Sequence, residues 1–155
     1  MKPSELIQNL ETTASQLTGR RVSVRIQEPI NQQARAETYN AGGGMVVIDL
    51  APEVFTDLRG FIRTFTHELA HAALHAHNVP VTNVHKPPAS FKISPQLMAQ
   101  ALQHPRMDKR ETEAEQLADT WRDAIKQRYT IAQNTPASDE NLIQVLRVLY
   151  TFKKG

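Results

Sequence analysis

The chain has 155 residues, of which 40% are hydrophobic and 22% are charged, as is typical of a globular protein with a buried core. It contains no cysteine, which excludes disulfides, a thiol nucleophile and a zinc site built from thiolates. The formal net charge is only +2, and no apolar run approaches the roughly 18 residues needed to span a bilayer. Because the polar start lacks the layout of a secretory signal, we expect a single cytoplasmic domain over residues 1–155.

The first part of the sequence predicts one helix followed by strands. We expect Ser4 to cap a helix over residues 5–17, which Gly19 ends. Alternating apolar residues predict a strand over 21–27. A weakly signalled strand is expected over 35–40, and the segment MVVIDL at 45–50 predicts the strongest one. The three glycines at 42–44 connect the last two. Because a strand follows them, a hairpin turn is favoured over a phosphate-binding loop.

The second part of the sequence is mainly helical. We expect a long helix from Pro52 to about residue 77, an irregular proline-rich loop over 78–94 and a short helix over 94–103 that Pro105 stops. Asp108 is expected to cap a further helix through residue 128, and a connector over 134–138 leads to a last helix over 139–152. This order predicts an α+β fold in which helices pack on a small mixed or antiparallel sheet.

The long central helix contains the pattern H-E-x-x-H at His67, Glu68 and His71. Helical positions four apart lie about 40° apart and one turn up, so both imidazoles can reach one metal ion. Glu68 lies near enough to act on a water at that ion without being a ligand. The alternative is a pair of surface histidines, but the apolar row that includes Phe65 and Leu69 lies nearly opposite. That arrangement is typical of a metal site facing a cleft.

A zinc site of this kind needs a third protein ligand, and a later helix offers three glutamates. Its apolar side carries Ala114, Leu117, Ala118 and Trp121. Glu113 lies at the edge of that side and is our first candidate, with Glu111 and Glu115 as alternatives. An acidic surface in solvent is the competing interpretation for this cluster, and it would suit two of the three residues.

The segments THELAHAALH and ETEAEQLAD resemble the ImmA/IrrE type of metallopeptidase and the peptidase-like domain of the antirestriction protein ArdC. The resemblance covers roughly residues 40–122 and is carried by these two motifs. It implies a zincin-like fold, with zinc at His67, His71 and, by motif matching, Glu113. The chain departs from the family pattern at Leu117, where an aromatic residue is usual, and in the long stretch from 72 to 110.

With zinc bound, the expected activity is hydrolysis of a peptide bond in a protein or peptide substrate, with Glu68 as general base. Candidate donors to the oxyanion are Tyr39, His75, His85, His104 and Tyr129. One alternative is a binding protein of phage or plasmid biology that kept the scaffold without proteolysis. A nucleic-acid-binding protein is the other, suggested by the basic residues near the end and by the likeness to ArdC. A solvated surface explains those residues more simply.

Overall fold

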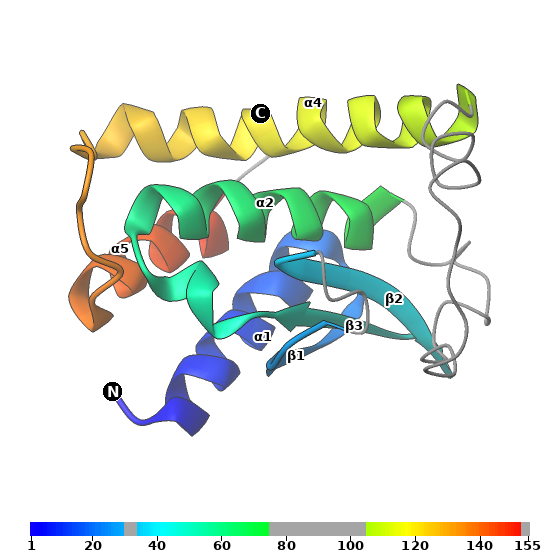
Figure 1. Cartoon of the computed structure of the whole chain (residues 1–155), viewed down its shortest axis with the longest axis horizontal. Helices are drawn as coiled ribbons and strands as arrows, with labels where there is room; N and C mark the ends of the chain where they lie inside the picture. Colours follow the sequence, from blue (N-terminus) through cyan, green and yellow to red (C-terminus); the bar gives the residue numbers. More distant parts are fainter. Residues whose placement is uncertain (30–33, 75–104, 153–155) are drawn as a thin grey trace.

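The computed structural model describes residues 1–29, 34–74 and 105–152, with only the backbone described for 105–108. This part of the chain forms four α-helices, one 3₁₀ turn and a three-stranded sheet, in the α+β order expected from the sequence (Figure 1). The loop expected over 78–94, the short helix over 94–103 and the end of the long helix near 77 lie outside the described residues. No described helix is both long and apolar enough to cross a membrane.

Helix α1 (Pro3–Thr18) begins earlier than expected. Its N-cap is Lys2, with no side-chain cap and with proline at the start of the helix, so Ser4 is not the cap. Proline suits this position because the first helical N–H groups have no partner within the helix. Gly19 ends the helix as predicted, in the left-handed conformation with φ of 71°, and its N–H donates to Ser15 O.

The sheet is mixed, with strand order β1-β3-β2. Strand β1 (Arg21–Ile26) runs parallel to β3 (Met45–Leu50), and β2 (Ala36–Gly42) runs antiparallel to it. Gly43 and Gly44, with φ of 62° and 78°, form the turn between β2 and β3. Positive φ at both positions is what a tight hairpin turn requires, so the predicted hairpin is confirmed.

The two outer strands of the sheet differ in what covers their edges. On β1, Val22 N–H donates to Ser15 Oγ and Val24 N–H donates to the Glu11 carboxylate, so side chains of α1 occupy that edge. Strand β2 pairs with β3 alone among the described strands. Edge N–H and C=O groups can pair with a further extended chain, and β2 is therefore the edge suited to that role.

The predicted long helix is interrupted near its start. Pro52–Phe55 form a 3₁₀ turn, and helix α2 (Leu58–Leu74) begins after Asp57. The Asp57 carboxylate accepts from Gly60 N–H at 3.4 Å. A Cβ at Gly60 would lie 2.6 Å from Asp57 Oδ1, so the glycine leaves room for this contact. The start at Pro52 is thus corrected to Leu58, because Asp57 caps the helix locally.

The last two helices follow the sequence closely, apart from the start of the first and the end of the second, which lies at Tyr150 and not at residue 152. Helix α4 (Pro105–Arg128) begins at Pro105, so Asp108 lies inside it and is not its cap. A proline fits the first turn of a helix as well as it ends a preceding one. Helix α5 (Asp139–Tyr150) is capped by Ser138, whose Oγ accepts from Asn141 N–H.

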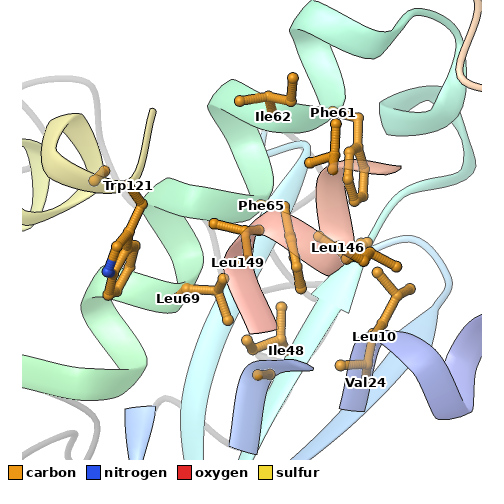
Figure 2. Packing of buried hydrophobic residues seen from close by; sticks show 14 of the residues in the cluster. Leu10, Val24, Ile48, Phe61, Ile62, Phe65, Leu69, Trp121, Leu146 and Leu149 are labelled. Carbon is orange, nitrogen blue, oxygen red and sulfur yellow. The ribbon is translucent and has the colours of Figure 1, made fainter. Parts of the chain in front are cut away.

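The hydrophobic core lies between the sheet and the helices, with α2 between α4 and the sheet (Figure 1). Phe61, Phe65 and Leu69 of α2 are completely buried. Figure 2 shows them facing residues of the sheet, α1 and α5, while Trp121 of α4 packs against α2 from the other side. This packing fixes which face of α2 is turned away from the core and is therefore available to a functional site.

Candidate metal centre

The H-E-x-x-H pattern lies in the C-terminal half of α2, on the side that faces α4. The side chains of His67 and His71 are 24% and 19% exposed. Glu68 is buried, with only 8% of the residue exposed. The core residues Phe65 and Leu69 point to the opposite side, because each lies about 200° around the helix from the histidine two positions later. The helix thus has a core face and a histidine face, as predicted.

Helix α4 brings a carboxylate to both histidines. His67 Nε2 and His71 Nε2 are 3.0 Å apart. Glu111 Oε2 lies 3.1 Å from His67 Nε2, and Glu111 Oε1 lies 3.2 Å from His71 Nε2. Within the described part of the chain, His67, His71 and Glu111 form a group whose candidate ligand atoms all lie within 4.8 Å of one another.

These separations fit a tetrahedral metal site. Zinc binds imidazole nitrogen and carboxylate oxygen at about 2.0–2.2 Å, which places neighbouring ligand atoms of a tetrahedron roughly 3.3 Å apart. The three measured separations of 3.0, 3.1 and 3.2 Å are close to that value. Two neutral imidazoles and one carboxylate also match a zinc donor set that keeps a fourth position open.

Behind this cluster, a second carboxylate fixes the orientation of one imidazole. His67 Nδ1 lies 2.6 Å from Glu115 Oε1 and can donate to it. The Arg122 guanidinium in turn donates to both oxygens of Glu115, at 2.8 and 3.2 Å. Holding the proton on Nδ1 leaves Nε2 as the free lone pair, which is how metal-binding histidines are commonly oriented. The arrangement of Arg122, Glu115 and His67 would thus leave Nε2 of a neutral His67 as a candidate ligand atom.

Glu68 is held from the sheet side. The Thr38 hydroxyl of β2 lies 2.6 Å from Glu68 Oε2, in hydrogen-bonding distance. Burial raises the pKa of Glu68 above its ordinary value, and the hydrogen bond from Thr38 opposes that shift. A buried carboxylate whose pKa is raised takes up a proton more readily than a solvated one, which suits a general base beside a candidate metal site.

The charges of the cluster are arranged to stabilise a cation. The pKa of His67 is raised to about 9, chiefly by its hydrogen bond to Glu111 and also by Glu115, although burial opposes the shift. The pKa of Glu111 lies far below its usual range because of His67 and then His71. Arg122, followed by His67, lowers the pKa of Glu115. Carboxylates that stabilise an imidazolium at this position would equally stabilise a metal cation in its place.

Glu113, our first candidate from the sequence, lies elsewhere on α4. It is half-buried and is not a member of the cluster formed by the two histidines and Glu111. Two residues along a helix correspond to about 200° of rotation, so Glu111 and Glu113 leave the helix in nearly opposite directions. The carboxylate that meets the histidines is thus Glu111, one of the two alternatives to Glu113.

Among the expected oxyanion donors, two lie in the described part of the chain. The Tyr39 hydroxyl contacts Arg25, whose guanidinium also binds the buried Asp49. Tyr39 and Thr38 are neighbours on one strand and so point to opposite faces of the sheet, which turns Tyr39 away from Glu68. Tyr129 lines a pocket near the start of α2. His75, His85 and His104 lie outside the described residues.

The sequence contained a signal that separates Glu111 from Glu113. Glu111, Glu115 and Arg122 are spaced by four and seven residues, so they form one stripe along α4. On this stripe, Glu115 and Arg122 carry opposite charges. His67 and His71 form a stripe on α2 that faces it. Motif matching and the edge of the apolar face favoured Glu113. A metal-binding histidine also needs a carboxylate that accepts from its other ring nitrogen, and that requirement favours Glu111 as the ligand, with Glu115 as this second carboxylate.

Comparisons with protein-family models, curated proteins and solved structures give no match to this chain. The likeness to ImmA/IrrE metallopeptidases therefore remains a prediction carried by the two motifs. The functional argument that follows depends on the geometry of the side chains.

Proposed function

We propose that this protein is a zinc-dependent peptidase in which His67, His71 and Glu111 hold the metal and Glu68 is the general base. The observation that supports this most directly is the set of separations between three candidate ligand atoms, 3.0, 3.1 and 3.2 Å. The two distances to Glu111 join helices α2 and α4, so they do not follow from the local H-E-x-x-H spacing. In this proposal Glu111 replaces Glu113 as the third ligand.

Zinc in such a site lowers the pKa of water toward neutrality and polarises the carbonyl of a peptide bond. Glu68 accepts a proton from the attacking water and later delivers it to the leaving amine. The hydrogen bond from Thr38 holds the Glu68 carboxylate in place for both transfers. Glu115 and Arg122 keep the His67 ring in one orientation and one tautomer.

Strand β2 supplies a way to hold the substrate. It is an outer strand of the sheet, and Thr38 joins it directly to Glu68. An extended peptide that pairs with such an edge is held by main-chain hydrogen bonds, and its carbonyl groups are presented at regular intervals. This supports a peptide substrate bound in extended conformation beside α2.

The first experiment measures metal. Purified protein is stripped with chelator, reloaded with zinc and assayed for bound metal by mass spectrometry. We expect about one zinc ion per chain, and we expect His71→Ala to lose it because the remaining ligands leave the site incomplete. Equal zinc content in the wild-type protein and in His71→Ala would contradict the proposed site.

The second experiment separates metal binding from chemistry. Glu68→Gln keeps the size of the side chain but removes the base, so the variant should retain zinc and lose hydrolysis of a mixed synthetic peptide library by at least about 100-fold. Cleavage is detected as new peptide termini by mass spectrometry. Undiminished cleavage by Glu68→Gln would exclude Glu68 from the mechanism.

A further inference from the structure

A second concave site lies at the other end of the contact between α2 and α4. It has a volume of about 830 Å³ and is lined by residues from the start of α2, the end of α4 and the segment that follows α4. The aliphatic side chains of Ile62, Ile125 and Ile131 contribute to its lining. This volume lies within the range of about 300–1,000 Å³ that is usual for ligand-binding clefts.

Four basic residues line this pocket, and two of them are fully engaged by the protein itself. Arg59 donates from two nitrogens to Ile131 O, at 3.0 and 2.7 Å. Arg122 donates to Glu115, Asp119, Thr66 Oγ1 and Arg63 O, and its side chain is only 13% exposed. These two arginines therefore build the wall of the pocket and have little capacity left for a ligand.

The other two basic residues, Arg63 and Lys126, are different. Both are exposed and line the same pocket. Neither side chain forms a hydrogen bond or ion pair with any part of the chain that the structure describes. The two acids of the lining form no ion pair with Arg63 or Lys126 in the described structure, since Asp119 contacts Arg122 and Asp57 accepts from Gly60 N–H. The pocket thus combines apolar side chains with two cations that have no ion-pair partner among the described residues.

We infer that this pocket binds an acidic, aliphatic segment of the peptide substrate, outside the bond that is cleaved. Carboxylates of that segment pair with Arg63 and Lys126, while an aliphatic side chain packs on the half-buried Ile131, beside which Ile62 and Ile125 are buried. Naming the segment as part of a substrate depends on the proposed peptidase function. The binding of an acidic peptide to the pocket does not.

The position of the pocket relates it to the metal centre. Arg63 precedes His67 by four residues on α2, which corresponds to one helical turn and about 6 Å along the axis. Arg122 lines the pocket and also contacts Glu115, which accepts from His67. A bound segment would therefore lie beside the metal centre, from which Arg122 separates it.

The apolar lining favours a peptide over a nucleic acid. Phosphate backbones are bound chiefly by lysine and arginine on exposed surfaces, whereas this pocket carries two aspartates and three isoleucines among its lining residues. A segment that alternates acidic and aliphatic side chains matches both the unpaired cations and the isoleucines. Electrostatic complementarity of this kind gives selectivity among peptides.

The test uses the full-length Glu68→Gln protein, so that the peptide probe is not cleaved during the measurement. A fluorescein-labelled peptide of alternating glutamate and leucine is titrated by fluorescence anisotropy at low salt. We expect saturable binding that weakens by about tenfold or more in the double variant Arg63→Glu/Lys126→Glu, because attraction becomes repulsion at both cations. The double variant Arg63→Gln/Lys126→Gln should weaken binding less, and thermal melts of both check their folding.

The matched control is Arg21→Glu, which makes the same kind of charge change at an exposed position on β1. It should leave the affinity unchanged. The inference is overturned if Arg21→Glu weakens binding as much as Arg63→Glu/Lys126→Glu does, or if a peptide with glutamine in place of glutamate binds equally well. It is also overturned if a single-stranded oligonucleotide binds more tightly and with the same dependence on Arg63 and Lys126.

The outcomes for docking and for catalysis are separable. If the peptide binds as expected but wild-type protein loaded with zinc cleaves no peptide in the library, the docking site stands and the peptidase proposal fails. If the library is cleaved but the acidic peptide does not bind, the docking inference fails alone. If both hold, cleaved peptides should be enriched in acidic residues, and Arg63→Glu/Lys126→Glu should remove that enrichment.

Discussion

The two faces of helix α2 are built according to different requirements. On one face, Phe61, Phe65 and Leu69 are completely buried and need only to fill space against the sheet and the other helices. On the other face, His67 and His71 must meet Glu111 at separations near 3 Å. A core tolerates exchanges of similar volume, whereas a metal site depends on the position of individual atoms.

This difference means that stability and metal binding should respond to different substitutions. The contacts of the core face are non-directional and depend on buried area. The opposite face depends on the directed contacts of both histidines with Glu111. It also depends on Glu115, which holds His67, and on Thr38, which holds Glu68. Substitutions on each face should therefore separate the two properties.

The largest effect is expected on the core face. Phe65→Ala removes a completely buried ring that stacks on Phe61 with centroids 5.2 Å apart. It should lower the free energy of unfolding by about 3–5 kcal/mol because it leaves a cavity, as measured by denaturant titration. Molecules that remain folded should keep their zinc affinity. A large loss of zinc affinity without loss of stability would contradict the conclusion that the two faces control different properties.

The next effect tests which glutamate is the ligand. Glu111→Gln should weaken zinc binding by more than about 100-fold, since even residues behind the ligands affect affinity by about 10–100-fold. Competition with a chromophoric chelator measures this. Glu113→Gln on the same helix is the matched control and should have little effect. If Glu113→Gln weakens zinc binding and Glu111→Gln does not, Glu113 is the third ligand.

A smaller effect is expected from the carboxylate behind His67. Glu115→Ala removes the acceptor of the His67 Nδ1 proton and should weaken zinc binding by about 10–100-fold. Gln116→Ala, at the neighbouring exposed position, is the control for a change in the helix itself. Unchanged zinc affinity in Glu115→Ala would mean that the position of His67 is fixed by packing alone.

The smallest effect concerns Thr38. Thr38→Val keeps the shape of the side chain but removes the hydroxyl that lies 2.6 Å from Glu68 Oε2. The net contribution of a hydrogen bond is about 0.5–1.5 kcal/mol, so kcat/KM should fall by about two- to tenfold while zinc content stays the same. Thr38→Ser should restore most of the rate. Equal rates for the valine and serine variants would exclude the hydroxyl from the positioning of Glu68.

Much of the fold could be predicted because its signals are local. The apolar segment at 45–50, the glycines at 42–44 and Gly19 predicted a strand, a hairpin turn and a helix end that the structure contains. Boundaries that depend on competing caps were wrong. Lys2 replaces Ser4 at the start of α1, Asp57 divides the expected long helix, and α4 begins before Asp108. Several residues near each of these boundaries can serve as a cap, and the choice depends on what the helix packs against.

The sequence by itself determined that His67 and His71 share one side of a helix and that Glu68 lies beside them, because the rotation of about 100° per residue is a local property. Only the tertiary structure decided which carboxylate meets them. The rotation of α4 about its own axis is set by the packing of Ala114, Ala118 and Trp121 in the core. That packing turns Glu111 and Glu115 toward α2. Likewise, Thr38 reaches Glu68 only because β2 is the edge strand beside α2. The two residues are thirty positions apart in the chain, so no local pattern encodes their contact.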